Sequence, residues 1–166
     1  MLVLLRKYPE IRETELMKVY AESNRENAEV FHPGLEALEA IGLVEQDFLS
    51  YLRRDFFREK GAFCAVWEEF GCYCSALRMQ HYLDGWLLSA LETAPNLRRR
   101  GFGQMLVQAV QETLAPGEKL YSHVSRRNKA SQGLHKNCGF SVFRDVAVYL
   151  DGSADAGSDT LLYVKP

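Results

Sequence analysis

The stretch Thr93-Ala-Pro-Asn-Leu-Arg-Arg-Arg-Gly-Phe-Gly-Gln104 decides the fold of this chain. Residues 86–91 before it are apolar in the manner of a buried strand, and residues 104–110 after it have the spacing of an amphipathic helix. A strand–turn–helix junction of this kind points several backbone N–H groups at one place, where the helix dipole adds about half a positive charge. Gly101 and Gly103 let the backbone approach a ligand without a Cβ in the way. The junction therefore predicts a site for a diphosphate or a similar polyanion.

Two common nucleotide motifs do not fit this junction. A P-loop has four residues between its glycines, followed by Gly-Lys-Ser/Thr, and no such run occurs in the chain. The dinucleotide fingerprint Gly-x-Gly-x-x-Gly/Ala requires a small residue where this chain has Leu106. What remains is an anion site of a third kind, or a basic turn whose glycines only allow tight packing.

A second motif follows after one more helix and strand. It reads Asn128-Lys-Ala-Ser-Gln-Gly-Leu-His-Lys-Asn-Cys-Gly-Phe140. The first motif matches the pattern Arg/Gln-x-x-Gly-x-Gly/Ala of the GNAT superfamily, the acetyl-CoA-dependent N-acyltransferases. The second is similar to that superfamily's Asn-x-x-Ala/Ser…Leu-Tyr-x-x-x-Gly-Phe segment. With both motifs in order and correctly spaced, the chain resembles this superfamily from about residue 63 to residue 140.

Length and composition describe an ordinary globular protein. The 166 residues predict a single domain over 1–166, large enough to bury a core without disulfides or metals. A net charge of −2 argues against a nucleic-acid partner, which usually requires a strongly basic face. The arginines at 98–100 and 126–127 nevertheless lie beside the two motifs, which fits a small polyanion bound locally.

Cysteine spacing and hydropathy exclude further classes. Cys64, Cys72, Cys74 and Cys138 lack the spacing of a zinc site, so we expect reduced thiols, no metal and a cytoplasmic location. No stretch approaches the roughly 18 apolar residues of a membrane span, and the apolar run at residues 2–5 is too short for a signal peptide. We therefore expect no membrane partner.

Turn residues divide the chain into elements in the order β-α-α-β-β-β-α-β-α-β-β. Thr14 is the expected N-cap of the first helix, which His32-Pro-Gly34 ends, and residues 151–159 are an expected flexible loop. The order predicts an α/β fold, with a mixed, mostly antiparallel central sheet of about seven strands flanked by helices. It is also the order of the GNAT fold. The strands are expected at 2–5, 62–69, 72–81, 86–93, 119–124, 140–150 and 160–164, and the other helices at 35–60, 103–114 and 130–137.

The resemblance implies that acetyl-CoA is the cosubstrate and suggests how it is held. The strand before the first motif is expected to splay at a bulge near residues 91–93, where backbone groups of Leu91 and Thr93 would pair with the pantetheine arm. The Thr93 amide would face the thioester oxygen, an oxyanion-hole role that contributes about 3 kcal/mol. Asn128 and Ser131 are expected cofactor contacts. The pyrophosphate would lie on Arg98, Arg99, Arg100, Gly101, Phe102, Gly103 and Gln104.

Two proton transfers require an acid and a base. His135 stands where the superfamily commonly has the tyrosine that reprotonates the thiolate, and it either acts as this acid or only lines the cofactor pocket. Glu92, closest to the expected bulge, is a candidate base facing the acceptor. Other candidate bases are Asp84, Glu68, Glu69 and His81, while Tyr121 and His123 are further candidates to line the cleft. Residues expected near the acceptor are Tyr20, Phe31, His32, Arg53 and Arg78.

These expectations predict an N-acetyltransferase. It would transfer acetyl from acetyl-CoA to the primary amine of a small-molecule or peptide acceptor, by direct attack in a ternary complex. One alternative is an acyl-CoA-binding sensor or interaction module with little or no catalysis, and another is an enzyme with a longer acyl donor. The resemblance also allows a homodimer paired through the late strands.

Overall fold

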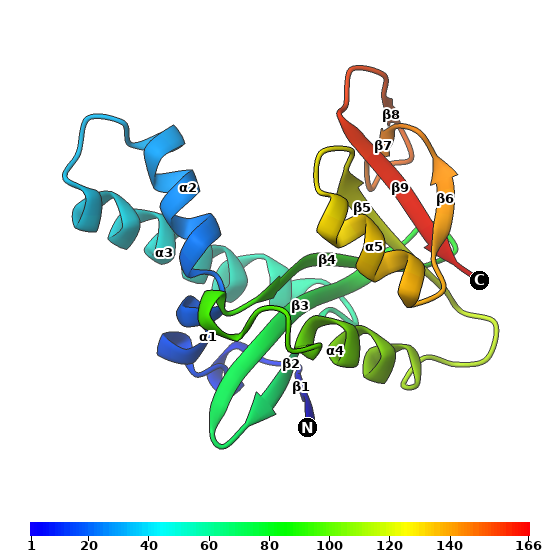
Figure 1. The fold of residues 1–166 in the computed structure, drawn as a ribbon, viewed down its shortest axis with the longest axis horizontal. Coiled ribbons are helices and arrows are strands. Elements are labelled where there is room, and N and C mark those ends of the chain that lie inside the picture. The colour runs from blue at the N-terminus through cyan, green and yellow to red at the C-terminus, as the bar shows by residue number, and fades with distance from the viewer.

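A seven-stranded sheet in the order β1-β2-β3-β4-β5-β9-β6 forms the centre of the computed structural model, which describes residues 1–166 (Figure 1). Only β4 and β5 pair in parallel, and every other neighbouring pair in this sheet is antiparallel. The predicted mixed, mostly antiparallel sheet is therefore confirmed. The strands are β1 (Leu2–Leu5), β2 (Phe63–Glu69), β3 (Cys72–Tyr82), β4 (Gly85–Thr93), β5 (Lys119–Ser125), β6 (Ser141–Arg144) and β9 (Thr160–Lys165).

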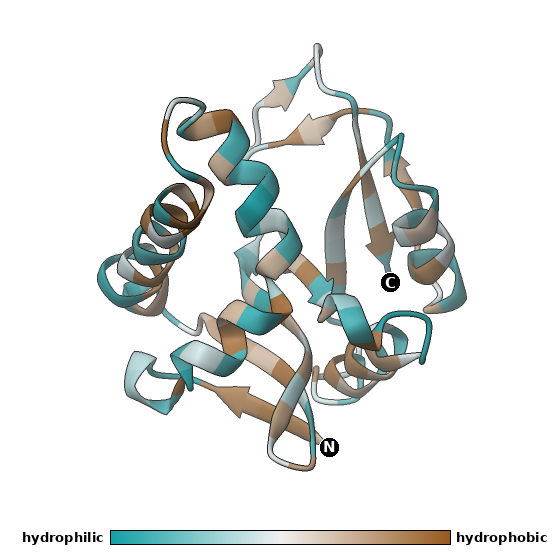
Figure 2. Cartoon of the chain, turned by 60° about the vertical axis from the view of Figure 1, so that its left-hand side comes forward, coloured by the Kyte–Doolittle hydropathy of each residue, from teal (hydrophilic) through white to brown (hydrophobic).

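Helices cover both faces of the sheet. The first part of β2 is buried on both sides and reads as an unbroken apolar run, so its alternate residues enter two different cores. Cys64 and Val66 pack with the helices between β1 and β2, whereas Ala65 packs with the helix after β4. Figure 2 shows the brown, hydrophobic stripes of these helices. They are α1 (Glu13–Val19), α2 (Ala21–Phe31) and α3 (Ala37–Arg54) before β2, then α4 (Phe102–Gln111) and α5 (Lys129–Asn137).

A β-bulge separates the second half of β4 from β5. The two strands pair only where Gly85–Leu88 lies beside Lys119–Ser122. In the pairing with β3, Arg78 lies opposite Ser89 but Ala76 lies opposite Glu92, so one extra residue is inserted in β4. Ala90 in this bulge has φ +50°. The splay is therefore present, with its bulge at Ala90–Leu91 rather than centred on the predicted 91–93.

Several predicted boundaries were wrong. The first helix breaks at Tyr20 into α1 and α2, and α1 begins at Glu13, so Thr14 is not its cap. The next helix, α3, starts after Glu36, whose carboxylate accepts from the Leu38 and Glu39 amides, and ends at Arg54 instead of Lys60. None of the helices combines the length and apolar composition that crossing a membrane requires.

The C-terminal part folds back more than the sequence predicted. The expected strand 140–150 divides into β6 and β7 (Ala147–Val148), and the expected loop contains β8 (Ala154–Asp155), which pairs with β7. Val148 is buried against Tyr82 and Tyr121, and the Tyr82 hydroxyl donates to the Val148 carbonyl at 2.7 Å. The chain changes direction between β6 and β7, and this bend brings Val148 into the small core with Tyr82 and Tyr121.

Gly85 allows the close parallel approach of β4 to β5. A Cβ at this position would overlap the Lys119 carbonyl oxygen, whereas a Cβ at Gly42 in α3 would meet no atom within 4 Å. We expect Gly85→Ala to lower the free energy of unfolding by about 1–3 kcal/mol, because the overlap forces the strands apart. Gly42→Ala should raise it by about 0.5–1 kcal/mol. Urea unfolding monitored by circular dichroism measures both, and equal effects of the two substitutions would contradict this account of Gly85.

Candidate functional site

The turn between β4 and α4 exposes a run of unpaired backbone N–H groups. The Leu97 amide donates to Ala94, and the Met105 amide donates to Gly101, but the amides from Arg98 to Gln104 have no hydrogen-bond acceptor within the chain. Gly101 is the N-cap of α4 and has φ +85°, a conformation that favours glycine. Unpaired amides at a helix N-terminus suit an anion. We call residues Arg98–Gln104 the amide cradle.

Gly103 holds the amide cradle against the splayed strand. A Cβ here would approach the Thr93 Oγ1 atom and the Leu134 Cδ1 atom to 3.2 Å each. The Ser75 hydroxyl also donates to the Phe102 carbonyl at 3.2 Å, which ties the first turn of α4 to β3. The second glycine of the motif therefore brings Thr93 beside the amide cradle.

The three arginines of the cradle have different environments. The Arg98 guanidinium pairs with Glu22 of α2, and its Nε lies 3.4 Å from the Thr93 carbonyl oxygen. Arg99 and Arg100 are exposed and make no ion pair with the protein. Arg98 therefore links the cradle to α2, and only Arg99 and Arg100 present unpaired charge to an anion.

His135 lies inside the protein, and only 1% of its surface is exposed. Its Nδ1 is 2.8 Å from the Ser131 carbonyl oxygen, and its Nε2 is 2.8 Å from the Ser122 hydroxyl. Since a carbonyl oxygen can only accept, Nδ1 carries the proton and Nε2 accepts from Ser122. Burial lowers the pKa of His135, which keeps the ring neutral. With both nitrogens bonded inside the chain, His135 fits the lining or packing role better than the acid role.

The Gly-Phe pair after α5 forms a helix-ending motif. The Phe140 amide donates to the His135 carbonyl and the Gly139 amide to the Lys136 carbonyl, both at 3.0 Å, with Gly139 at φ +85°. This is a Schellman motif, in which the side chain after the glycine, here Phe140, often contacts the side chain five residues before it, here His135. The Phe140 and His135 rings lie 5.0 Å apart, edge to face. The ring of His135 therefore packs against the Gly-Phe pair that ends the helix.

The other two predicted contacts of the second motif begin α5. The Asn128 Oδ1 atom accepts from the Ser131 amide at 2.9 Å, so Asn128 is the N-cap of this helix. The Ser131 hydroxyl lies 3.3 Å from His135 Nδ1. Asn128 keeps its amide NH₂ free for a ligand.

A cavity of about 210 Å³ lies at the bulge, on the face of the sheet that α1–α3 cover. The predicted Tyr20 and Arg78 line it, whereas Phe31, His32 and Arg53 do not. The Tyr20 hydroxyl donates to the Ala90 carbonyl at 2.8 Å and so holds the bulge. We call this the acceptor cavity. Its lining is Tyr20, Ser23, Asn24, Asn27, Val44, Phe48, Arg78, Ala90 and Glu92.

Glu92 brings a carboxyl group into the acceptor cavity. Burial raises the pKa of Glu92, and the carboxylates of Glu22 and Glu26 raise it further, against the lowering effects of the Ser23 hydroxyl and Arg98. Neighbouring residues in a strand point to opposite faces, so Glu92 faces this cavity while Thr93 faces α4. One strand thus separates the amide cradle from the acceptor cavity.

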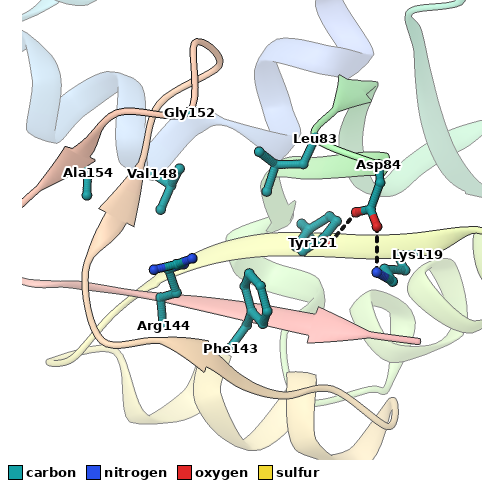
Figure 3. A pocket seen from close by; sticks show the side chains of 9 residues that line it. All are labelled: Leu83, Asp84, Lys119, Tyr121, Phe143, Arg144, Val148, Gly152 and Ala154. Atoms are coloured by element: carbon teal, nitrogen blue, oxygen red, sulfur yellow. Dashed lines mark hydrogen bonds and ion pairs between the residues drawn. The ribbon is translucent and has the colours of Figure 1, made fainter.

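The remaining base candidates lie elsewhere. Asp84, at the other end of β4, binds the Lys119 ammonium and the Tyr121 hydroxyl at 2.5 Å each, and these bonds lower the pKa of Asp84 (Figure 3). All three residues line a second cavity, of about 480 Å³. Glu68 pairs with Arg12, Glu69 accepts from the Trp67 indole, and His81 stacks on Trp86. His123 accepts at 3.3 Å from the amide of Val148, a residue that also lines the second cavity.

Comparison with known proteins identifies the fold. Residues 76–149 match the family model described as FR47-like protein. An acetyltransferase from Thermus thermophilus has a TM-score of 0.67 at 19% identity, covering 100% of this chain and 97% of that chain. The PaiA N-acetyltransferase from Thermoplasma acidophilum, solved in complex with coenzyme A, has a TM-score of 0.65 at 13% identity. The match covers 99% of this chain and 98% of that chain. No curated protein sequence matches the chain.

The chain has the GNAT fold. The fold that the resemblance to the GNAT superfamily implied is thereby confirmed. In this GNAT-fold chain the family match, residues 76–149, begins in β3 and includes the bulge, the amide cradle and the whole second motif. The helices that line the acceptor cavity precede the match, whereas Arg78, Ala90 and Glu92 of its lining lie inside the match.

Burial of His135 makes the stability of this GNAT fold depend on pH. An unfolded histidine titrates near pH 6.5, and burial lowers the pKa of His135 and of His123 in the folded chain. Below about pH 6.5 the unfolded chain therefore binds more protons, and stability falls as pH falls. We expect a smaller fall for His135→Gln, because of these two histidines only His123 then contributes.

Urea unfolding at several values between about pH 7.5 and pH 5.5 measures this dependence. His32→Gln, at the end of α2, is the control and should keep the wild-type dependence. A His135→Gln variant with the wild-type dependence would show that the ring does not remain neutral in the fold.

Proposed function

We propose that this protein is an N-acetyltransferase that moves an acetyl group from acetyl-CoA to a primary amine, by direct attack in a ternary complex. The observation that carries the proposal is the position of β4. Thr93 adjoins the amide cradle on one face, and Glu92 enters the acceptor cavity on the other. Both substrates can therefore meet at the same bulge, without transfer through a protein group. None of the four cysteines lines the acceptor cavity.

The chain's own groups fit coenzyme A. Its pyrophosphate would accept from the amides of the cradle, from Arg98 to Gln104, which have no acceptor inside the chain. Arg99 and Arg100 would add charge, and the free Asn128 amide would donate at the start of α5. Beyond Leu88, β4 no longer pairs with β5, which leaves an edge near Leu91 and Thr93 for the pantetheine arm. When bound, acetyl-CoA supplies the activated acyl thioester.

Glu92 is the proposed general base. An amine with a pKa near 10 is free of its proton in about one molecule per thousand at pH 7, a cost of roughly 4 kcal/mol. A carboxylate whose pKa is raised by burial accepts a proton more readily than an exposed one. The Thr93 amide would then stabilise the oxyanion. The thiolate would take its proton from water or the substrate ammonium, since His135 is buried.

A second candidate function is a module that binds acyl-CoA without catalysis. The burial of His135 favours it, because the position commonly assigned to the acid cannot reach a ligand in this structure. Thermal shift with acetyl-CoA, followed by thiol release against a panel of primary amines, separates the two functions. Stabilisation together with thiol release supports the enzyme, and stabilisation without release supports the module. Repeating the assay with longer acyl-CoAs tests the donor.

We expect Glu92→Gln to lower kcat/KM for acetyl transfer by about 10²- to 10⁴-fold, because the substitution removes the base and keeps the shape. The wild-type rate should rise with pH through the raised pKa of Glu92, and the variant should lack this rise. Thiol release at several pH values measures both. Glu29→Gln, on the exposed side of α2, is the control and should behave as wild type. A fully active Glu92→Gln variant would remove Glu92 from the mechanism.

A further inference from the structure

Arg78 enters the acceptor cavity without an anionic partner. It makes no ion pair or hydrogen bond with any residue, and its Nε is buried without an acceptor. A guanidinium carries five N–H donors and stays charged, so leaving it unpaired in a partly buried place is costly. The cavity therefore contains a positive group whose donors are available.

Aromatic rings hold this guanidinium in place. Its central carbon lies 5.5 Å from the centroid of Phe48, 5.2 Å from that of Tyr51 and 5.7 Å from that of Phe56. Contacts with ring faces restrict the orientation of the group but leave the N–H donors at its edge unsatisfied. Arg12 and Arg53 also stack on tyrosines, but each of them pairs with a carboxylate, of Glu68 and Glu13 respectively.

Glu92 lies in the same cavity but does not neutralise Arg78. Ala76 is the cross-strand partner of Glu92, and Arg78 follows it by two residues, so Arg78 and Glu92 share a face of the sheet. The two side chains form no ion pair with each other. The acceptor cavity therefore presents a carboxyl group and a guanidinium at separate places, with polar side chains of Ser23, Asn24 and Asn27 around them.

The size of the cavity indicates the size of its ligand. Its volume of about 210 Å³ is below the range of about 300–1,000 Å³ that is usual for pockets of drug-sized ligands, which favours a small ligand. A ligand that complements the two charges needs an ammonium near Glu92 and an anion near Arg78. A carboxylate matches the planar fork of a guanidinium with two parallel hydrogen bonds.

We propose that the acceptor is a small molecule carrying a carboxylate as well as the reacting amine, and that Arg78 binds this carboxylate. This inference rests on the proposed function, because it places the amine beside Glu92 at the bulge. A carboxylate site at Arg78 would distinguish amino acids from amines that lack a carboxylate. Polyamines would also bring a second positive charge toward Arg78.

Matched pairs of acceptors that differ only in the carboxylate test the proposal. They are lysine and cadaverine, ornithine and putrescine, phenylalanine and phenethylamine, and methionine and 3-(methylthio)propylamine, each assayed by thiol release with acetyl-CoA. We expect at least one amino acid to exceed its decarboxylated partner in kcat/KM by about 10- to 100-fold. The preference should disappear in Arg78→Met and persist in part in Arg78→Lys, which keeps the charge without the fork.

Arg53→Gln is the matched control, because Arg53 also stacks on a tyrosine but lies outside the cavity. It should keep the wild-type preference. Thermal melting checks that each variant is folded, and the ratio within a pair cancels any general loss of activity. If no amino acid is preferred over its partner, or if Arg78→Met keeps the preference, the proposal is overturned.

A binding measurement makes the inference independent of turnover. Calorimetry on the protein saturated with coenzyme A would compare the N-acetyl derivatives of the same pairs. N-acetyl amino acids could bind, with Arg78→Met abolishing this binding, while the acceptor assay shows no thiol release. That outcome would retain the carboxylate site and remove the proposed enzyme. Thiol release that does not depend on the carboxylate would retain the enzyme and overturn the inference.

Discussion

The hydrogen bond from the Tyr20 hydroxyl to the Ala90 carbonyl is the interaction on which the site depends. An alanine at φ +50° costs about 1–2 kcal/mol relative to an ordinary strand conformation. Tyr20 compensates for this strain from a buried position, where its ring packs against Phe48 at 5.1 Å. The N-terminal helices therefore maintain the bulge that opens the sheet, even though they lie far from it in sequence.

The opened strand divides the work between two groups of helices. On one face α4 and α5 supply the backbone amides and the capping residues, which would bind an anion by geometry and dipole rather than by a specific side chain. On the other face α2 and α3 supply most of the side chains around Glu92 and Arg78. Arg98 joins the two groups, because it extends from the cradle to Glu22. The proposed cofactor side thus consists mainly of backbone groups, and the proposed acceptor side consists mainly of side chains.

The parts that could be predicted from the sequence are those with local signals. Glycines and alternating apolar residues mark the hairpins, and the Arg-x-x-Gly-x-Gly run marks the cradle, because each depends on residues close in the chain. Glu92 was a candidate base because it adjoins the expected bulge, and the structure places it in a cavity. Gly139 follows the predicted helix end at residue 137, and this glycine was the available local signal for the contact between Phe140 and His135.

What could not be predicted depends on distant contacts. No glycine or proline separates α1 from α2, and the break at Tyr20 serves its long-range bond to Ala90. The burial of His135 follows from its hydrogen bond to Ser122 of β5 and its contact with Tyr163 of β9. The pairing of the Arg98 guanidinium, which removes its charge from the cradle, depends on Glu22 on another helix. Arg78 had no local signal that it would remain unpaired.

The proposed role of the main-chain N–H groups at the start of α4 is to hold coenzyme A. A titration of the ¹⁵N-labelled protein with coenzyme A, followed by two-dimensional ¹H–¹⁵N NMR, tests it most directly. We expect the amides from Arg98 to Gln104 to shift most, since they have no acceptor within the chain. Two results would contradict this role of the amides. One is saturation of the protein with coenzyme A while the signals of these amides do not shift, and the other is no shift of any amide at high coenzyme A concentration.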